Sequence, residues 1–171
     1  IRGVGGVVEA DGHGVALLPG VPEEGAACLV EAGDHGVLVL EDAVAFLSQC
    51  DERAIVGPEG VRLAFSKPYR DGEHVAYPAQ DTPVSIVKGR MMLLRRRALD
   101  HVRLSTAFDV ARDADDIAVS AMAAGGRPGR HIVPALFRGR LHDLDQHGVG
   151  LNQRQGHHER REAARRKYFM E

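Results

Sequence analysis

Short apolar runs, each closed by glycine or proline, alternate with a helical pattern in the first half of the chain. A buried strand is expected over 26–31, and a turn follows it. A helix is expected to open at Glu41, with Asp42 as its N-cap, and a second buried strand is expected over 53–57. A strand, a helix and a strand in this order predict an α/β layer.

The pattern becomes more interrupted further along the chain. The elements expected there are a strand over 61–65, a loop over 66–83, strands over 84–87 and 91–94, and one or two helical turns over 98–102. Residues 1–25 are rich in glycine, but Val8 stands where a G-x-G-x-x-G dinucleotide loop needs its last glycine. That loop is therefore rejected.

The stretch 113–134 combines an acidic cluster, a short apolar helix over 117–124, a pair of glycines that ends the helix, and an apolar strand over 131–134. Asp115 and Asp116 open the helix, where the helix dipole stabilises negative charge. Two interpretations stay open for this pair. The carboxylates cap the helix, or one of them acts as a general base that takes a proton from a hydroxyl group.

The C-terminal residues 152–171 have a helical pattern with many arginines and few apolar positions. They are expected to form a basic helix that is either solvated or an arm that contacts membrane lipids or a partner chain. Residues 1–150 are accordingly predicted as one domain and 151–171 as a charged helical tail.

Composition limits the class of protein. The chain has 171 residues, of which 44% are hydrophobic and 27% charged, which predicts a soluble globular domain. No signal peptide is visible in the sequence, and a cytoplasmic location is expected. Residues 1–60 carry two basic side chains against eleven acidic ones, so the remainder is basic. A basic second half suits an anionic ligand or is only a solvated face.

The 5% aromatic content and the lack of a binding motif argue against nucleic acid as a partner. Cys28 and Cys50 are expected to be reduced, packed thiols.

Asp34 and His35 lie in a turn between two glycines, directly after the first predicted strand. A carboxylate and an imidazole at the carboxyl end of a strand are candidate ligands for Mg²⁺ or Mn²⁺, with substrate phosphates and water completing the shell. The alternative is a plain polar turn. The histidines at 142, 147, 157 and 158 lack zinc-ligand spacing and are interpreted as surface residues.

Five segments carry a resemblance to a known family. They are, in chain order, CLVEAGDHGVLVLEDAVAFLSQC from Cys28, AIVGPEGV from Ala54, SKPYR from Ser66, VKGRMMLLR from Val87, and DDI from Asp115 followed by GRPGRHIVP from Gly126. Their order and spacing over 26–140 resemble a family 2 glycosyltransferase with the GT-A nucleotide-diphospho-sugar fold.

The resemblance implies an α/β fold with a GT-A-like, mixed but mostly parallel sheet flanked by helices. It implies a transfer of sugar from a nucleotide-diphosphate donor, for which UDP-sugar is the expected type, to a hydroxyl acceptor such as a glycan. Asp116 would be the catalytic base with Asp115 beside it. Asp34 and His35 would hold the metal, and Asp34, Arg70 and Arg90 would bind the donor.

The sequence also departs from this family. The family's metal motif carries two or three aspartates, whereas Gly33 and His35 stand at two of these positions here. Residues 1–25 are shorter than the family's nucleotide-binding start, so that part is expected to be short or missing. A second hypothesis is therefore a degenerate, non-catalytic GT-A-like domain that binds a glycan or a partner protein. Peripheral contact with the inner face of a membrane through the basic tail is a further expectation.

Overall fold

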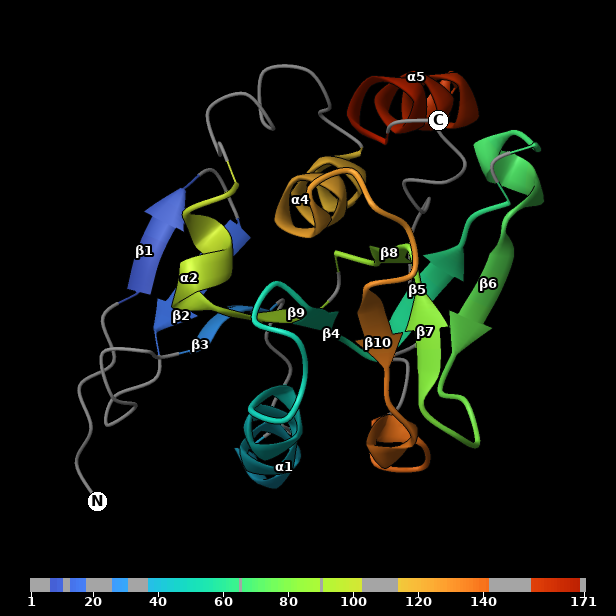
Figure 1. The fold of residues 1–171 in the computed structure, drawn as a ribbon. Helices are drawn as coiled ribbons and strands as arrows, with labels where there is room; N and C mark the ends of the chain where they lie inside the picture. The colour runs from blue at the N-terminus through green and yellow to red at the C-terminus, as the bar shows by residue number, and fades with distance from the viewer. Residues whose placement is uncertain are drawn as a thin grey trace.

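The structure, a computed structural model, describes residues 7–10, 13–17, 26–30, 37–64, 66–89, 91–102, 114–141 and 155–169. Its main sheet has seven strands in the order β1-β2-β3-β9-β4-β10-β7, and a smaller sheet has three in the order β6-β5-β8 (Figure 1). The strands of the main sheet are β1 (Val7–Ala10), β2 (His13–Leu17), β3 (Ala26–Val30), β9 (Met91–Arg95), β4 (Ile55–Val56), β10 (His131–Val133) and β7 (Thr82–Val84). Those of the smaller sheet are β6 (Glu73–Ala76), β5 (Glu59–Arg62) and β8 (Ile86–Val87).

The chain is an α/β protein with a mixed sheet, as the sequence predicts at this coarse level. The expectation of a mostly parallel sheet is wrong. Among the described strands only β4 and β10 pair in parallel, and the other pairings are antiparallel. The reason is that β9 inserts between β3 and β4 and runs antiparallel to both. Strands β3, β4 and β10 therefore share one direction, but β9 separates β3 from β4.

Alternating side chains of the central strands pack into two separate apolar layers, one on each face of the main sheet. Ile55 and Leu94 point to the side of α4 (Asp115–Ala124) and α2 (Arg96–Leu99), where they pack with Val119 and Ala123. Val56 and Leu93 point to the opposite side, where α1 (Val37–Leu47) and the short helix η2 (Ala135–Phe137) cover the sheet (Figure 1). This alternation is what a strand produces when both faces of its sheet are covered.

Helix α4 is buried on nearly every side because the main sheet, the smaller sheet and the last helix surround it. Val119 and Ala123 face the main sheet, while Ile117 and Ala121 pack with β5, β8 and the last helix, α5 (His157–Tyr168). The small residues of DDIAVSAMAA allow this close approach, and Gly125, with φ of 63°, ends the helix in the left-handed region that favours glycine.

Two further boundaries differ from the sequence prediction. Helix α1 begins at Val37 rather than at Glu41, so Asp42 lies inside the helix and pairs with Arg140 at 2.7 Å instead of capping it. The apolar run VLVL therefore starts the helix rather than preceding it. The expected loop over 66–83 contains the 3-10 helix η1 (Tyr69–Asp71), strand β6 and the start of β7.

Candidate functional site

The acidic pair lies in the first turn of α4, and its two members are placed differently. Asp116 is 6% exposed, whereas Asp115 is half-buried. The residue at the N-cap position is Ala114, which makes no side-chain capping bond. Asp116 Oδ1 instead accepts a hydrogen bond from the backbone N–H of Ile117 at 2.9 Å. The same N–H also donates to Ala114 O at 3.1 Å, so one oxygen of Asp116 shares an N–H of the helix start.

The other oxygen of Asp116 is held by an arginine from the C-terminal helix. Arg161 donates from Nη2 to Asp116 Oδ2 at 2.7 Å, and the two side chains are 8% and 7% exposed. Burial alone would lower the pKa of Arg161, but the charge and hydrogen bond of Asp116 outweigh it and raise the pKa above its usual value. The result is a buried, charge-assisted pair that fixes the Asp116 carboxylate.

Tyr69 and Glu162 complete the connection between α4, η1 and α5. The guanidinium carbon of Arg161 lies 4.7 Å from the centre of the Tyr69 ring, a cation–π distance. Burial raises the pKa of Tyr69, and the nearby Arg161 partly opposes this. Glu162 Oε2 accepts from the backbone N–H of Tyr69 at 2.7 Å, and Arg165 and Arg166 also donate to Glu162. Hydrogen bonds from Arg165 and the other donors lower the pKa of Glu162 to about 2.

A second ion pair, between Lys88 and Glu59, lies near the pair of Asp116 and Arg161. Lys88 Nζ is 3.6 Å from Glu59 Oε2, and the Glu59 side chain is 9% exposed. Gly89 follows Lys88, and a Cβ placed on Gly89 would lie 3.7 Å from Asp116 Cβ. Burial lowers the pKa of His74, and the charges of Lys88 and Arg161 lower it further. Charges of both signs therefore gather around the start of α4.

The pairing of β9 shows where the start of α4 lies relative to the main sheet. Met91, the first residue of β9, pairs with Val30 at the carboxyl end of β3, and Gly89 precedes Met91 by two residues. Leu93 pairs with Val56, the last residue of β4. The start of α4 therefore lies at the edge where β3 and β4 end, which is the edge at which α/β sheets bind their ligands.

The structure places only some of the predicted site residues. Asp115, Asp116 and Arg70 are described, and the first two lie together at the start of α4. Arg70 is exposed on η1, with its Nε 3.6 Å from Asp71 Oδ1. Asp34, His35 and Arg90 lie outside the described residues, as do the histidines at 142 and 147. His157 and His158, also predicted as surface residues, open α5 and stack edge to face at 5.5 Å.

The predicted metal site cannot be assembled from the described part of the chain. Within the ranges that the structure describes, no group of three or more His, Cys, Asp and Glu side chains could hold a metal ion. The predicted ligands Asp34 and His35 fall in the gap between β3 and α1. Cys50, expected to be a reduced thiol, is free and half-buried, and burial raises its pKa.

Sequence reasoning missed Arg161, which holds Asp116, and the neighbouring pair of Glu59 and Lys88. Arg161 looks like one more charge in HHERREAARRKY, and Glu59 and Lys88 stand singly at strand ends. A weak signal was present, because Arg161, Ala164, Arg165 and Phe169 recur at helical spacing and all are buried. Reading that stripe as a packed face would have predicted a carboxylate partner for a buried arginine.

Comparison with protein-family models, curated proteins and solved structures gave no significant match. None of the described helices is long and apolar enough to cross a membrane.

Proposed function

We propose that the chain is a GT-A-like glycosyltransferase, which moves a sugar from a nucleotide-diphosphate donor to a hydroxyl acceptor. The observation that carries the proposal is the acidic pair in the first turn of α4, at the carboxyl-end edge of the sheet, where the buried Arg161 holds Asp116 and with it this turn. A base needs this kind of fixed position to meet an acceptor hydroxyl at hydrogen-bond distance.

The order of elements supports the same proposal. In the sequence, Asp34 and His35 come after strand β3, and α1 and β4 follow. The segment with Lys88 then enters β9, and the acidic pair opens α4 before β10. This is the order of features on which the resemblance to family 2 glycosyltransferases rests.

The burial of the two aspartates favours different roles for them. Both oxygens of Asp116 already accept hydrogen bonds, one from Ile117 and one from Arg161. Asp115 is half-buried on the same helical turn. Because Asp115 is the more exposed of the two carboxylates, and so the one that an acceptor reaches more easily, we assign the proton-accepting role to Asp115, whereas the resemblance assigns it to Asp116. Asp116 would act as a positioning residue that fixes the first turn through Arg161.

Donor binding would fall to the basic residues, together with Asp34 and His35. Lys88 lies at the same sheet edge as the acidic pair, and it joins Arg70 and Arg90 as a candidate partner for the diphosphate. Mg²⁺ or Mn²⁺ on Asp34 and His35 would neutralise charge on the leaving diphosphate.

Replacing Asp115 tests the assignment of the base. Asp115→Asn should keep the fold and reduce release of nucleotide from a nucleotide-sugar by about 10²–10⁴-fold, the range for loss of a general base. Asp42→Asn is the matched control, because Asp42 lies on α1, on the other side of the sheet, where it pairs with Arg140. Full turnover in Asp115→Asn would return the role of base to Asp116.

One observation favours a second candidate, a non-catalytic domain of the same fold that binds a glycan or a partner protein. The Asp116 carboxylate is committed to Arg161, as in a purely structural ion pair. This candidate predicts glycan binding without release of nucleotide, whereas the transferase requires both. Measuring both quantities on the same sample separates the two.

A further inference from the structure

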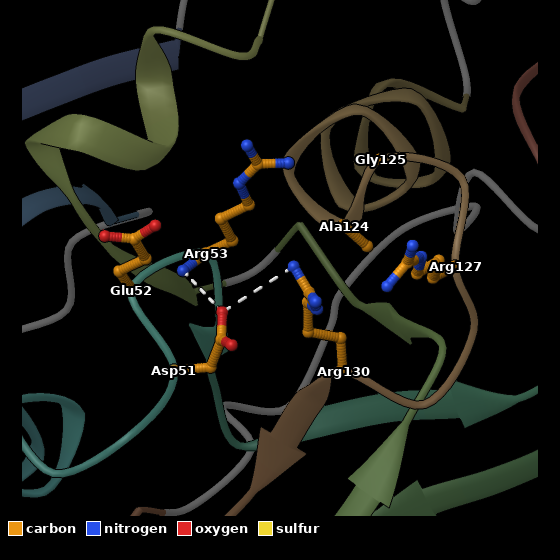
Figure 2. Close-up of a pocket in the computed structure, with 7 residues that line it drawn as sticks. All are labelled: Asp51, Glu52, Arg53, Ala124, Gly125, Arg127 and Arg130. Carbon is orange, nitrogen blue, oxygen red and sulfur yellow. Dashed lines mark hydrogen bonds and ion pairs between the residues drawn. The ribbon is translucent and has the colours of Figure 1, made fainter.

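A polar hollow of about 350 Å³ lies at the other end of α4. Arg53 enters it from the turn before β4, and Arg127 and Arg130 enter from the turn between α4 and β10 (Figure 2). Asp51 and Glu52 complete its charged lining. Three arginines against two acids leave the lining with a net positive charge.

The arginines of this hollow are only partly neutralised. Among the described residues, the guanidinium groups of Arg53 and Arg127 have no hydrogen-bond or ion-pair partner. Arg130 Nη1 is 3.7 Å from Asp51 Oδ1, which is too long for a hydrogen bond. The same Asp51 oxygen already accepts from the backbone N–H of Arg53 at 2.9 Å. Glu52 directs its carboxylate away from Arg127 and Arg130 (Figure 2).

The end of α4 does not supply the missing acceptors. The N–H of Gly125 donates to Met122 O at 3.1 Å, and the N–H of Gly126 donates to Ala121 O at 2.8 Å. The carbonyl groups of Ala121 and Met122 are therefore engaged within the turn itself. A guanidinium cannot lose its proton near neutral pH, so three of them around one hollow repel one another until an anion enters.

We propose that this hollow, which we call the arginine pocket, binds a phosphate monoester. Guanidinium groups match phosphate oxygens in a planar, two-bond geometry, and here they approach from two separate turns. A volume of about 350 Å³ is near the lower limit for small-molecule sites, so a phosphate on a small body fits better than a nucleotide.

The arginine pocket is distinct from the proposed transferase site. It lies where β4 and β10 begin and α4 ends, whereas Asp115 and Asp116 lie where α4 begins. A helix of ten residues separates the two by roughly 15 Å. The pocket does not depend on the transferase proposal, and its ligand is a separate molecule or a separate part of one.

The test is calorimetric titration of the chain with inorganic phosphate and with glycerol 3-phosphate. Both should bind saturably, the ester more tightly. Arg127→Gln should weaken binding by about tenfold or more, as loss of a charged hydrogen bond does. Arg127 is exposed, so this change should not disturb folding. Arg138→Gln, an exposed arginine after η2, is the matched control and should bind as the wild type does.

A second variant tests the same site by a gain of affinity. Asp51→Asn removes a competing negative charge, while its side-chain oxygen can still accept from the N–H of Arg53. It should bind phosphate several-fold more tightly than the wild type. The proposal is overturned if the wild type binds neither probe, or if Arg127→Gln binds both unchanged.

Vesicles distinguish the source of the phosphate. Sedimentation with phosphatidylcholine vesicles that contain phosphatidic acid should leave the chain in solution, because the pocket takes a small soluble ester. Co-sedimentation that Arg127→Gln abolishes would contradict the soluble ester and identify a lipid headgroup as the ligand.

Discussion

His131 is the residue at which β4, β10 and α4 are joined. Its side chain is fully buried, and its Nδ1 accepts from the backbone N–H of Ile55 at 3.1 Å. Its Nε2–H then donates to Ser120 O at 2.8 Å, which fixes the neutral tautomer. Burial lowers the pKa of His131 to about 4, although the bond to Ser120 opposes the shift.

This depressed pKa predicts a pH dependence of stability. Between pH 6.5 and pH 4 the unfolded chain binds a proton that folded His131 does not, so stability falls as the pH falls through this window. This pKa shift corresponds to a loss of about 3 kcal/mol in the free energy of unfolding by pH 4. Urea denaturation at a series of pH values measures it. His131→Asn, which retains an acceptor for Ile55, should flatten this slope, and His101→Asn, an exposed control, should not.

Individual residues were predictable only where their partners are near in sequence. The acidic pair and the glycines that end its helix could be read directly from DDIAVSAMAAGG. The partner of Asp116 is 45 positions away, and that of His131 is 76 positions away. Nothing in the local pattern distinguishes such a buried charge from a solvated one, because burial is a property of the folded chain.

At the scale of elements, α5 is attached to α4 and η1 by charged contacts as well as by apolar packing. Arg161 pairs with Asp116, and Glu162 accepts from the backbone of Tyr69. Ala164 and Phe169 join the same apolar cluster as Ile117. The sequence predicted a basic helix here but not the face that it buries.

The Asp116–Arg161 pair should therefore contribute strongly to stability. Arg161→Met leaves a buried carboxylate without its counter-charge and should lower the free energy of unfolding by about 3–5 kcal/mol. The matched control is Arg62→Met, which breaks an exposed pair with Glu73 of the same 2.7 Å length and should cost less than about 1 kcal/mol. Denaturant titration compares them. Equal losses in the two variants would mean that Arg161 is not buried as described.

At the scale of the whole molecule, glycines set how closely the two sheets approach each other. A Cβ on Gly57 would overlap the carbonyl oxygen of Met91 and lie 2.5 Å from Val87 Cγ1. Gly57 therefore allows the chain to pass from β4 toward β5 against the start of β9. The sequence predicted a strand that ends at this glycine and an α/β class. It could not predict strand directions, because these depend on β9 inserting between β3 and β4.

Gly57→Ala should consequently disturb the junction of the sheets. The backbone of β9 must shift to admit the methyl group, so we expect a loss of about 1–3 kcal/mol in the free energy of unfolding. Gly89→Ala is the control, since its Cβ would make only an ordinary contact of 3.7 Å, and it should stay within about 1 kcal/mol of the wild type. Thermal unfolding of the two variants compares them, and a tolerated Gly57→Ala would argue against this packing.

We propose that the sheet edge beside Asp115 and Asp116 belongs to a nucleotide-sugar transferase. Calorimetric titration of the folded chain with UDP in the presence of Mn²⁺ tests it most directly. We expect saturable heat that persists in Asp115→Asn, because the base does not bind the donor. The heat should also persist in Arg127→Gln, because the arginine pocket lies at the opposite end of α4. No heat from a folded sample, or heat that Arg127→Gln abolishes, would contradict the claim.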